Sequence, residues 1–388
     1  MSLKNIKLLS IFNLSIGFNP FWPLAIIYFA KVSGSYTLGT SIFGIIMLAS
    51  AFLELPTGVL SDRIGRKKTI VLGSWARLLA YLFYAIGLSY WFLVIGAVLE
   101  GLSRSFYSGN NDALLYDSLS ENKLKHQYQE HQGKVSSTEQ FAMGVSAIIG
   151  SLIASYSFKY LVWISLLPQI AILIISYMFI EPQITKKISS NIYQHLSSAL
   201  KLFIHNQKLC LLSLASIISF SISELKWQFG SAFVVTVWPI WAIGISKLLP
   251  SFGSSISFFY SGKLIKKFKE INILLFSSIY GKIISFIAYG FPSIFSPLLL
   301  ATPSVLHGVS SVSKSTLMQH QFTDEQRATM SSLNSLGGSL GFAIMSLFLG
   351  GLADSYGPAK ALIVLTLVSL PTVYIYWLLF KSSDLKTN

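Results

Sequence analysis

Apolar residues occur along this chain in long runs, separated by short polar segments that carry most of its charge. A helix needs about 20 apolar residues to cross the hydrocarbon core of a membrane. Twelve stretches meet this requirement, and they predict an all-α membrane protein with twelve transmembrane helices. The predicted spans are residues 8–30, 38–60, 69–88, 90–116, 135–155, 158–180, 209–232, 237–261, 271–290, 294–316, 330–352 and 358–380.

The first span is interrupted by polar residues and prolines, among them Asn19, Pro20 and Pro23. Its apolar run is longer than the core of a secretion signal, which has about 7–15 residues and ends in small residues at a cleavage site. We therefore interpret it as a spanning helix, and the prolines predict a kink.

Composition supports a membrane location. Of the 388 residues, 53% are hydrophobic and only 11% are charged, and the mean hydropathy is +0.61. Soluble domains carry about 25% charged residues, so this chain has too few to cover a soluble surface. The lipid bilayer is the expected partner of that surface. The one cysteine, Cys210, excludes an internal disulfide and a cysteine-based metal site.

The net charge of +14 is distributed unevenly. If the N-terminus is cytoplasmic, the inner segments hold 20 Lys and Arg residues, and the outer segments hold three when the first residues of the spans that follow them are included. Cytoplasmic loops of membrane proteins carry such an excess of positive charge. The bias therefore predicts that both termini are cytoplasmic, and it explains the basic character without a nucleic-acid partner.

Two weak internal matches suggest that the chain consists of two related halves. Residues 150–157 (GSLIASYS) resemble 350–357 (GGLADSYG), and residues 58–66 (GVLSDRIGR) resemble 262–270 (GKLIKKFKE), at offsets of 200 and 204. Offsets this similar favour a duplicated six-helix unit.

The predicted organisation is an N-terminal six-helix bundle (1–180), a cytoplasmic linker (181–208) and a C-terminal six-helix bundle (209–388). Within the linker, Ile192, Leu196, Leu200 and Phe203 recur at helical spacing. This spacing predicts an amphipathic helix on the inner membrane surface.

The segment after the second predicted span, residues 58–68, reads GVLSDRIGRKK. It resembles the G-x-L-a-D-r-x-G-r-k signature of the major facilitator superfamily, at the same place between helices two and three. The resemblance implies a monomeric secondary transporter that works by alternating access.

The residues of this segment have distinct physical roles. Gly58 allows close helix approach, Asp62 can stabilise a helix N-terminus, and Gly65 permits a tight turn. Arg63, Arg66 and Lys67 sit at the inner headgroups. In the family an acid at the end of helix four pairs with the motif's second arginine, which implies that Asp117 pairs with Arg66. We expect Gly58, Asp62, Arg63, Gly65, Arg66, Lys67 and Asp117 to form a gating latch at the inner side.

The second half departs from the signature. Lys266 stands in place of the aspartate and Lys269 in place of the downstream glycine. Only one latch of this type is therefore expected.

Residues 54–58 and 108–117 resemble those of bacterial family members that export solutes against protons. The resemblance implies that Arg104 takes part in proton transfer. The Gly-Pro pair expected in helix five of such exporters is missing, which leaves import open.

Charged residues inside the predicted spans are functional candidates, because a charge in the membrane costs several kcal/mol unless it is paired or hydrated. We assign Glu54, Glu100, Arg104 and Asp112 to proton coupling. The second half has a positive excess in its spans, which suggests that it binds an anionic group of the solute. The candidate substrate-binding residues are Arg77, Glu224, Lys226, Lys247 and Lys282.

The sequence favours a proton-coupled exporter of a small organic solute in the cytoplasmic membrane of a bacterium. The alternative is an importer or exporter of a specific anionic metabolite, such as a carboxylate or a siderophore. A membrane enzyme would need a cluster of acids or histidines at one face, and none is evident. No nucleotide-binding P-loop sequence occurs, and we expect no cofactor or metal.

Overall fold

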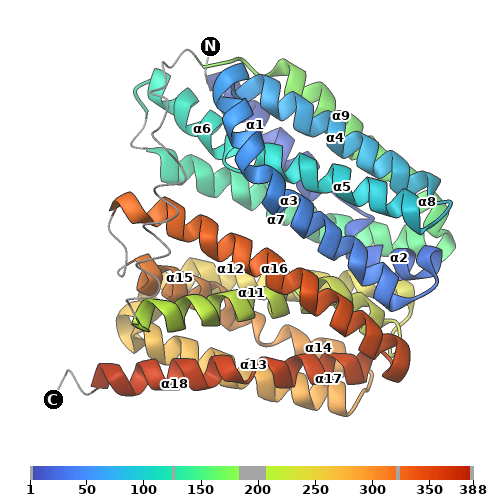
Figure 1. Ribbon diagram of the computed structural model, residues 1–388, viewed down its shortest axis with the longest axis vertical. Coiled ribbons are helices and arrows are strands. Elements are labelled where there is room, and N and C mark those ends of the chain that lie inside the picture. Colours follow the sequence, from blue (N-terminus) through green and yellow to red (C-terminus); the bar gives the residue numbers. More distant parts are fainter. Residues whose placement is uncertain (1–2, 125–126, 183–206, 320–323, 385–388) are drawn as a thin grey trace. The chain divides into compact units, whose positions relative to one another are not determined.

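The computed structural model describes residues 3–124, 127–182, 207–319 and 324–384, and within these ranges it contains helices and no strand (Figure 1). The α-helices of the N-terminal part are α1 (Leu3–Gly17), α2 (Ala25–Ser33), α3 (Tyr36–Ile64), α4 (Arg66–Ile86), α5 (Tyr90–Tyr107), α6 (Asn110–Glu121), α7 (Tyr128–Tyr156), α8 (Phe158–Ile164) and α9 (Leu166–Met178). Those of the C-terminal part are α11 (Gln207–Val234), α12 (Ile243–Phe268), α13 (Glu270–Gly290), α14 (Ser296–Ala301), α15 (Ser304–Gln319), α16 (Asp324–Tyr356), α17 (Pro358–Val368) and α18 (Pro371–Asp384). Short 3-10 turns lie at Trp22–Leu24 (η1) and Ile240–Ala242 (η3).

Every predicted span overlaps one helix or a pair of consecutive helices. Eight helical stretches are long and apolar enough to cross a membrane: Lys4–Ser33, Tyr36–Glu54, Arg66–Ile86, Phe158–Met178, Leu209–Val234, Glu270–Gly290, Leu333–Tyr356 and Pro358–Lys381. The fold is that of an all-α membrane protein, and the count of twelve spans is consistent with it.

Several predicted spans are interrupted. The first has its kink between α1 and α2, where residues 18–21 leave the helix. The span predicted at 90–116 was wrong as a single helix, because α5 ends at Tyr107 and α6 begins at Asn110. Gly109, with φ of +68°, takes a left-handed conformation that ends the helical path there.

The chain forms two compact units. Unit 1 comprises residues 1–188 with 239–245, and unit 2 comprises 189–238 with 246–388. The predicted linker falls near the division in sequence, but its predicted amphipathic helix (192–203) lies outside the described residues.

In unit 1, α4 and α3 both pack against α5, α1 packs against α7, and α4 also contacts α9 (Figure 1). Apolar residues of α1, α4, α6, α7 and α9 form one core, which includes Leu9, Phe12, Leu114 and Phe179. This packing places α4, α5 and α9 side by side, and their polar residues meet inside the unit.

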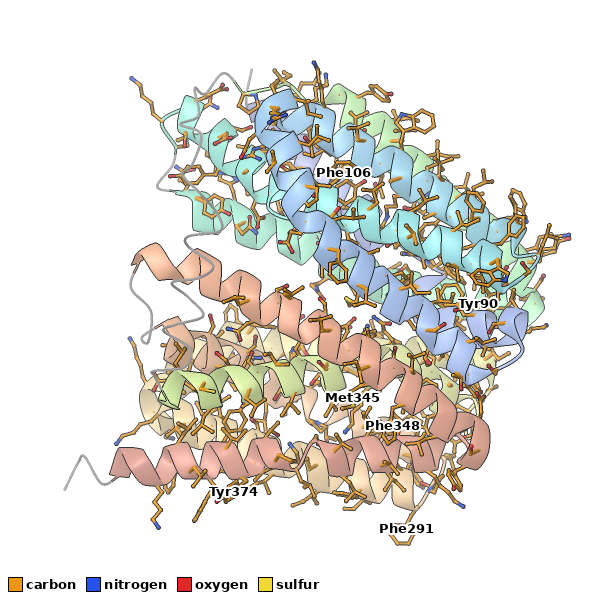
Figure 2. The ribbon with its side chains drawn as sticks, viewed as in Figure 1. Tyr90, Phe106, Phe291, Met345, Phe348 and Tyr374 are labelled. Atoms are coloured by element: carbon orange, nitrogen blue, oxygen red, sulfur yellow. The ribbon has the colours of Figure 1, made fainter. Side chains whose placement is uncertain are left out.

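In unit 2, α11 packs against α16, and α13 contacts α15, α17 and α18. A smaller core of α11, α13 and α18 includes Leu212, Leu274 and Tyr376. Large apolar side chains remain on the outside: Phe291 and Tyr374 point away from the helices (Figure 2) and are 79% and 60% exposed. Such exposure fits a lipid environment and would be unfavourable in water.

Candidate functional site

The turn between α3 and α4 depends on Gly65. Its φ of +95° with ψ of 163° is a conformation that residues with a side chain rarely adopt. A Cβ atom at this position would also lie 2.7 Å from Oε1 of Glu181. Glycine is therefore needed both for the backbone path and for the close approach of a carboxylate.

That carboxylate caps the start of α4. Oε1 of Glu181 accepts from the backbone N–H of Arg66, and Oε2 accepts from that of Lys67, both at 2.7 Å. The first N–H groups of a helix have no partner within the helix, and the helix dipole is positive there. The sequence does not reveal this role, because Glu181 stands there as the first residue of the predicted linker.

The side chain of Arg66 joins α3, α4 and α6. Nη2 lies 3.5 Å from Oδ1 of Asp62, and Nη1 donates at 2.8 Å to Oγ of Ser61 and to Oδ1 of Asn110. Ser61 also donates to Asn110, at 2.5 Å. Both Ser61 and Asn110 are buried. The segment thus has a fixed polar centre in which Asn110 takes part, a residue that the sequence did not single out.

The other predicted latch residues have different surroundings. Asp62 and Arg63 are exposed, and Asp117 lies on α6. Among the described residues, no atom would lie within 4 Å of a Cβ at Gly58. The expected close helix approach at Gly58 is therefore not seen, because the residue is on an exposed face of α3. The latch itself, including the Arg66–Asp117 pair, stays a prediction.

A second polar centre lies inside unit 1, around Glu100 of α5. Oε1 of Glu100 lies 3.3 Å from Nη1 of Arg77, which comes from α4, and 3.4 Å from Nε of Arg104, one turn further along α5. Glu100 is 1% exposed and Arg77 is 8% exposed, whereas Arg104 is 31% exposed. The structure thus brings together three residues that the sequence had assigned to two different roles.

Neighbouring side chains hold the two arginines differently. Nε of Arg77 donates to Oε1 of Gln169 of α9 at 2.7 Å, and its guanidinium lies over the ring of Tyr81. The guanidinium of Arg104 lies over the ring of Trp22, 5.1 Å from its centre. Arg77 is thereby held by side chains of α4, α5 and α9, whereas Arg104 remains partly exposed.

The second oxygen of Glu100 is free to interact further. Among the described residues, the buried Oε2 has no hydrogen-bond partner, and neither does the buried hydroxyl of Tyr84. The carboxylate interacts electrostatically with Tyr81 and Tyr84. A carboxylate with one free oxygen in a buried site is chemically suited to take up and release a proton.

Glu54 and Asp112, the other two acids assigned to coupling, lie apart from this cluster. Glu54 of α3 accepts from the hydroxyl of Ser108 at 3.1 Å. Asp112 is exposed in the first turn of α6 and accepts from Gln132 at 2.9 Å. Glu100 is buried, whereas Asp112 is exposed.

Unit 2 contains two partly buried lysines that donate to hydroxyl groups. Nζ of Lys226 (α11) donates to Ser285 at 3.1 Å, and Nζ of Lys282 (α13) donates to Ser278 at 2.7 Å and to Thr372 at 3.0 Å. These two lysines interact electrostatically with each other.

Lys247 (α12) is held separately. It donates to the carbonyl of Trp227 and lies over the ring of the same residue. It interacts electrostatically with Glu224, which accepts from Gln228 at 2.7 Å. Glu224 is the one acid in the predicted spans of the second half, and Lys247 is the lysine with which it interacts.

The described residues contain no group of three or more His, Cys, Asp and Glu side chains suited to hold a metal ion. Charged residues paired within a bundle of lipid-facing helices are typical of proteins that move solutes or protons across membranes. The structure therefore defines a polytopic membrane transport protein.

Comparison with known proteins identifies the family. The family model of the Major Facilitator Superfamily matches residues 8–344, and the chain belongs to this superfamily of secondary transporters. It is a multi-pass membrane protein with a small-molecule substrate.

Two bacterial relatives are similar in sequence. The MFS-type transporter YxaM of Bacillus subtilis is 20% identical over 394 aligned positions, which cover 96% of this chain and 94% of the relative. The multidrug resistance protein MdtH of Photorhabdus laumondii is 26% identical over 153 residues, which cover 38% and 36%.

Solved structures share the fold. A point mutant of the nucleoside transporter NupG matches with a TM-score of 0.80 at 12% identity, over 98% of this chain and 100% of the other. A bacterial homologue of the lysosomal transporter Spinster, crystallised inward-facing and unoccupied, matches with a TM-score of 0.75 at 14% identity, over 97% and 96%.

Proposed function

We propose that this chain is a proton-coupled exporter of a small organic solute, with Glu100 as its proton-carrying residue. The supporting observation is the position of Glu100: one oxygen is shared by Arg77 and Arg104, and the other is buried without a partner in the described structure. The partial similarity to a multidrug resistance protein agrees with export.

The proposed cycle follows from charge balance. A proton entering from the outside binds Oε2 of Glu100 and neutralises the carboxylate. Arg77 retains Gln169 as a partner, whereas the more exposed Arg104 loses its ionic partner and is free to reorient. Release of the proton to the cytoplasm restores both pairs. Export and proton entry are thereby coupled through the charge state of one residue.

Inverted membrane vesicles with and without an imposed proton gradient test this proposal. A panel of neutral, cationic and anionic compounds is screened for uptake and for release of protons from the vesicles. Glu100→Gln is expected to abolish accumulation against a gradient and to retain downhill exchange of the same compound. Accumulation at the wild-type level in this variant would exclude Glu100 as the coupling residue.

Glu54→Gln is the second coupling variant to test, and Asp112→Asn is a matched exposed control. Because Asp112 is exposed and bonded to Gln132, its replacement is expected to leave accumulation closer to the wild-type level.

The second candidate function is the transport of a specific anionic metabolite, either into or out of the cell. The lysines of unit 2 favour it: Lys247 is buried, Lys226 and Lys282 are partly buried, and the predicted spans of this half contain one acid, Glu224. Arg77, Glu224, Lys226, Lys247 and Lys282 are its proposed binding residues. In the vesicle screen, selective transport of carboxylates or phosphates would support it over a general exporter.

We further propose a monomer in the bacterial cytoplasmic membrane with both termini in the cytoplasm. The 20 to 3 distribution of positive charge supports this orientation. Labelling of single cysteines placed at either end, in intact cells and in inverted vesicles, tests it directly.

A further inference from the structure

The two units carry a cation at corresponding positions. Lys282 of α13 follows Arg77 of α4 by 205 residues, close to the offsets of the internal repeat. Arg77 bonds to Gln169 and Lys282 bonds to Thr372, and each of these partners directly follows a proline, at an offset of 203. In both units the cation is therefore held by the same pair of helices of the repeat.

The aromatic surroundings correspond as well. Tyr84 in unit 1 has its equivalent in Tyr289, again 205 residues later, and both are buried. In unit 2 this tyrosine lies beneath a second cation, because Nζ of Lys226 is 5.8 Å from its ring centre.

The acid that balances the cation is present in unit 1 alone. Glu100 stands on α5, which packs against α4 as α15 packs against α13. Residues 303–305, at offsets of 203–205 from Glu100, are Pro303, Ser304 and Val305. A Cβ at Gly281, next to Lys282, would lie 3.9 Å from Cβ of Pro303, so this part of the chain does face α13. The sequences of α14 and α15 contain no acid.

Unit 2 therefore holds Lys226 and Lys282 with no acid among their described partners, where unit 1 holds Glu100 between Arg77 and Arg104. Lys226 and Lys282 repel each other, and their described partners are hydroxyl groups and an aromatic ring. Two ammonium groups at membrane depth are unfavourable unless an anion compensates them or a lysine loses its proton, so a bound anion favours the state in which both lysines are charged.

We infer that Lys226 and Lys282 form an anion-binding subsite within unit 2, in which a carboxylate or phosphate group of the transported solute takes the place that Glu100 has in unit 1. This inference rests on the proposed function of the chain as a solute transporter and specifies the substrate class. Ser285 and Thr372 position the two lysines, and the hydroxyl of Ser278 adds a further contact to Lys282.

Thermal unfolding of the purified protein, without any proton gradient, tests the subsite. The probes are succinate, citrate, inorganic phosphate and glucose 6-phosphate at matched ionic strength, with glucose and tetraphenylphosphonium as neutral and cationic comparisons. At least one anion is expected to raise the Tm, and neither comparison compound should do so. Protection in Lys226→Met and in Lys282→Met should need at least tenfold more of that anion, and Lys282→Arg should restore it.

Lys314→Met is the matched control, because Lys314 is a partly buried lysine of the same unit outside the pair. It should keep the wild-type anion response. If no anion protects the wild type, or if both methionine variants retain full protection, the subsite is refuted. Should one methionine variant fail to fold, the other still decides the outcome.

The test separates this inference from proton coupling. Glu100→Gln should retain anion protection, since the subsite lies in the other unit. Loss of accumulation in Glu100→Gln, together with no anion protection of the wild type, would support the proton-coupled exporter and refute the subsite. Anion protection of the wild type together with unchanged accumulation in Glu100→Gln would support the subsite and exclude Glu100 as the coupling residue.

Discussion

Two single residues set the backbone at corresponding turns of the two units. Gly65 precedes α4 and Lys269, 204 residues later, precedes α13, and both have positive φ values. Lys269 has φ of 62° and ψ of 151°, a region populated almost only by glycine. In the second unit this turn is therefore formed by a lysine in a backbone conformation that suits glycine.

Lys269→Gly is expected to raise the free energy of unfolding by about 1 kcal/mol. The change removes a backbone strain of roughly 1–3 kcal/mol, and the greater freedom of glycine in the unfolded chain offsets part of this gain. Thermal unfolding measures the change. Lys263→Gly, inside α12, is the control and should lower stability by about 1 kcal/mol. A loss of stability in Lys269→Gly would contradict the strain.

Glu181 is the second residue with a definite local role. Replacing it by Ala removes two hydrogen bonds to the first N–H groups of α4, and we expect a loss of about 0.5–1 kcal/mol in unfolding free energy. Glu270→Ala in the first turn of α13 is the comparison. It should cost about 0.3–1 kcal/mol through the helix dipole. An unchanged Tm in Glu181→Ala would show that solvent replaces the cap fully.

At the scale of helices, small residues decide how closely α3 and α5 approach. A Cβ at Gly101 would lie 2.5 Å from Cβ of Ala49 and 2.8 Å from the carbonyl oxygen of Ile46. In membranes, helix association depends on such close packing, since the lipid provides no hydrophobic driving force between helices. Glu100, the residue before Gly101, is on the same helix and contacts Arg77 of α4.

Gly101→Ala should therefore lower the Tm and weaken proton coupling together, because the added methyl group separates α5 from α3. Ala49→Gly in the same chain removes the opposing methyl group and is expected to recover most of the loss. Gly262→Ala is the control in α12, where a Cβ meets no described atom within 4 Å. If Gly101→Ala behaves like Gly262→Ala, α3 and α5 are not in close contact in the membrane.

The whole molecule must change conformation to transport, and the polar centre around Arg66 is the proposed control of that change. Arg66 contacts Asp62, Ser61 and Asn110, which ties three helices of unit 1 together at one end. In the corresponding segment of unit 2, Lys266 and Lys269 stand in place of the aspartate and the glycine. We therefore expect a gating latch of this type in unit 1 alone.

Asp62→Asn should reduce initial transport rates by at least tenfold with expression unchanged, since it removes the charge that Arg66 faces at 3.5 Å. Labelling of single cysteines placed at both faces should show a shifted conformational balance. Asp354→Asn, an exposed acid in unit 2, serves as the control. Wild-type rates and labelling in Asp62→Asn would refute the latch.

The sequence by itself determined the class of the fold. Runs of about 20 apolar residues cannot be covered in water, so hydropathy alone predicts spanning helices, and the charge bias of the loops predicts their orientation. Polar residues are costly in apolar segments. The motif at residues 58–68 and the isolated charges in the spans therefore stand out in the sequence.

Tertiary structure alone decided which of those charges meet. Arg77 and Glu100 are on different helices, and only the packing of α4 against α5 brings them to 3.3 Å. Gln169, Asn110 and Glu181 became recognisable when their partners were in place, since a polar side chain in a sequence does not reveal which distant donor or acceptor it faces. Helix periodicity fixes the face that a residue occupies, and the contacts between faces are set by the packing of the whole unit.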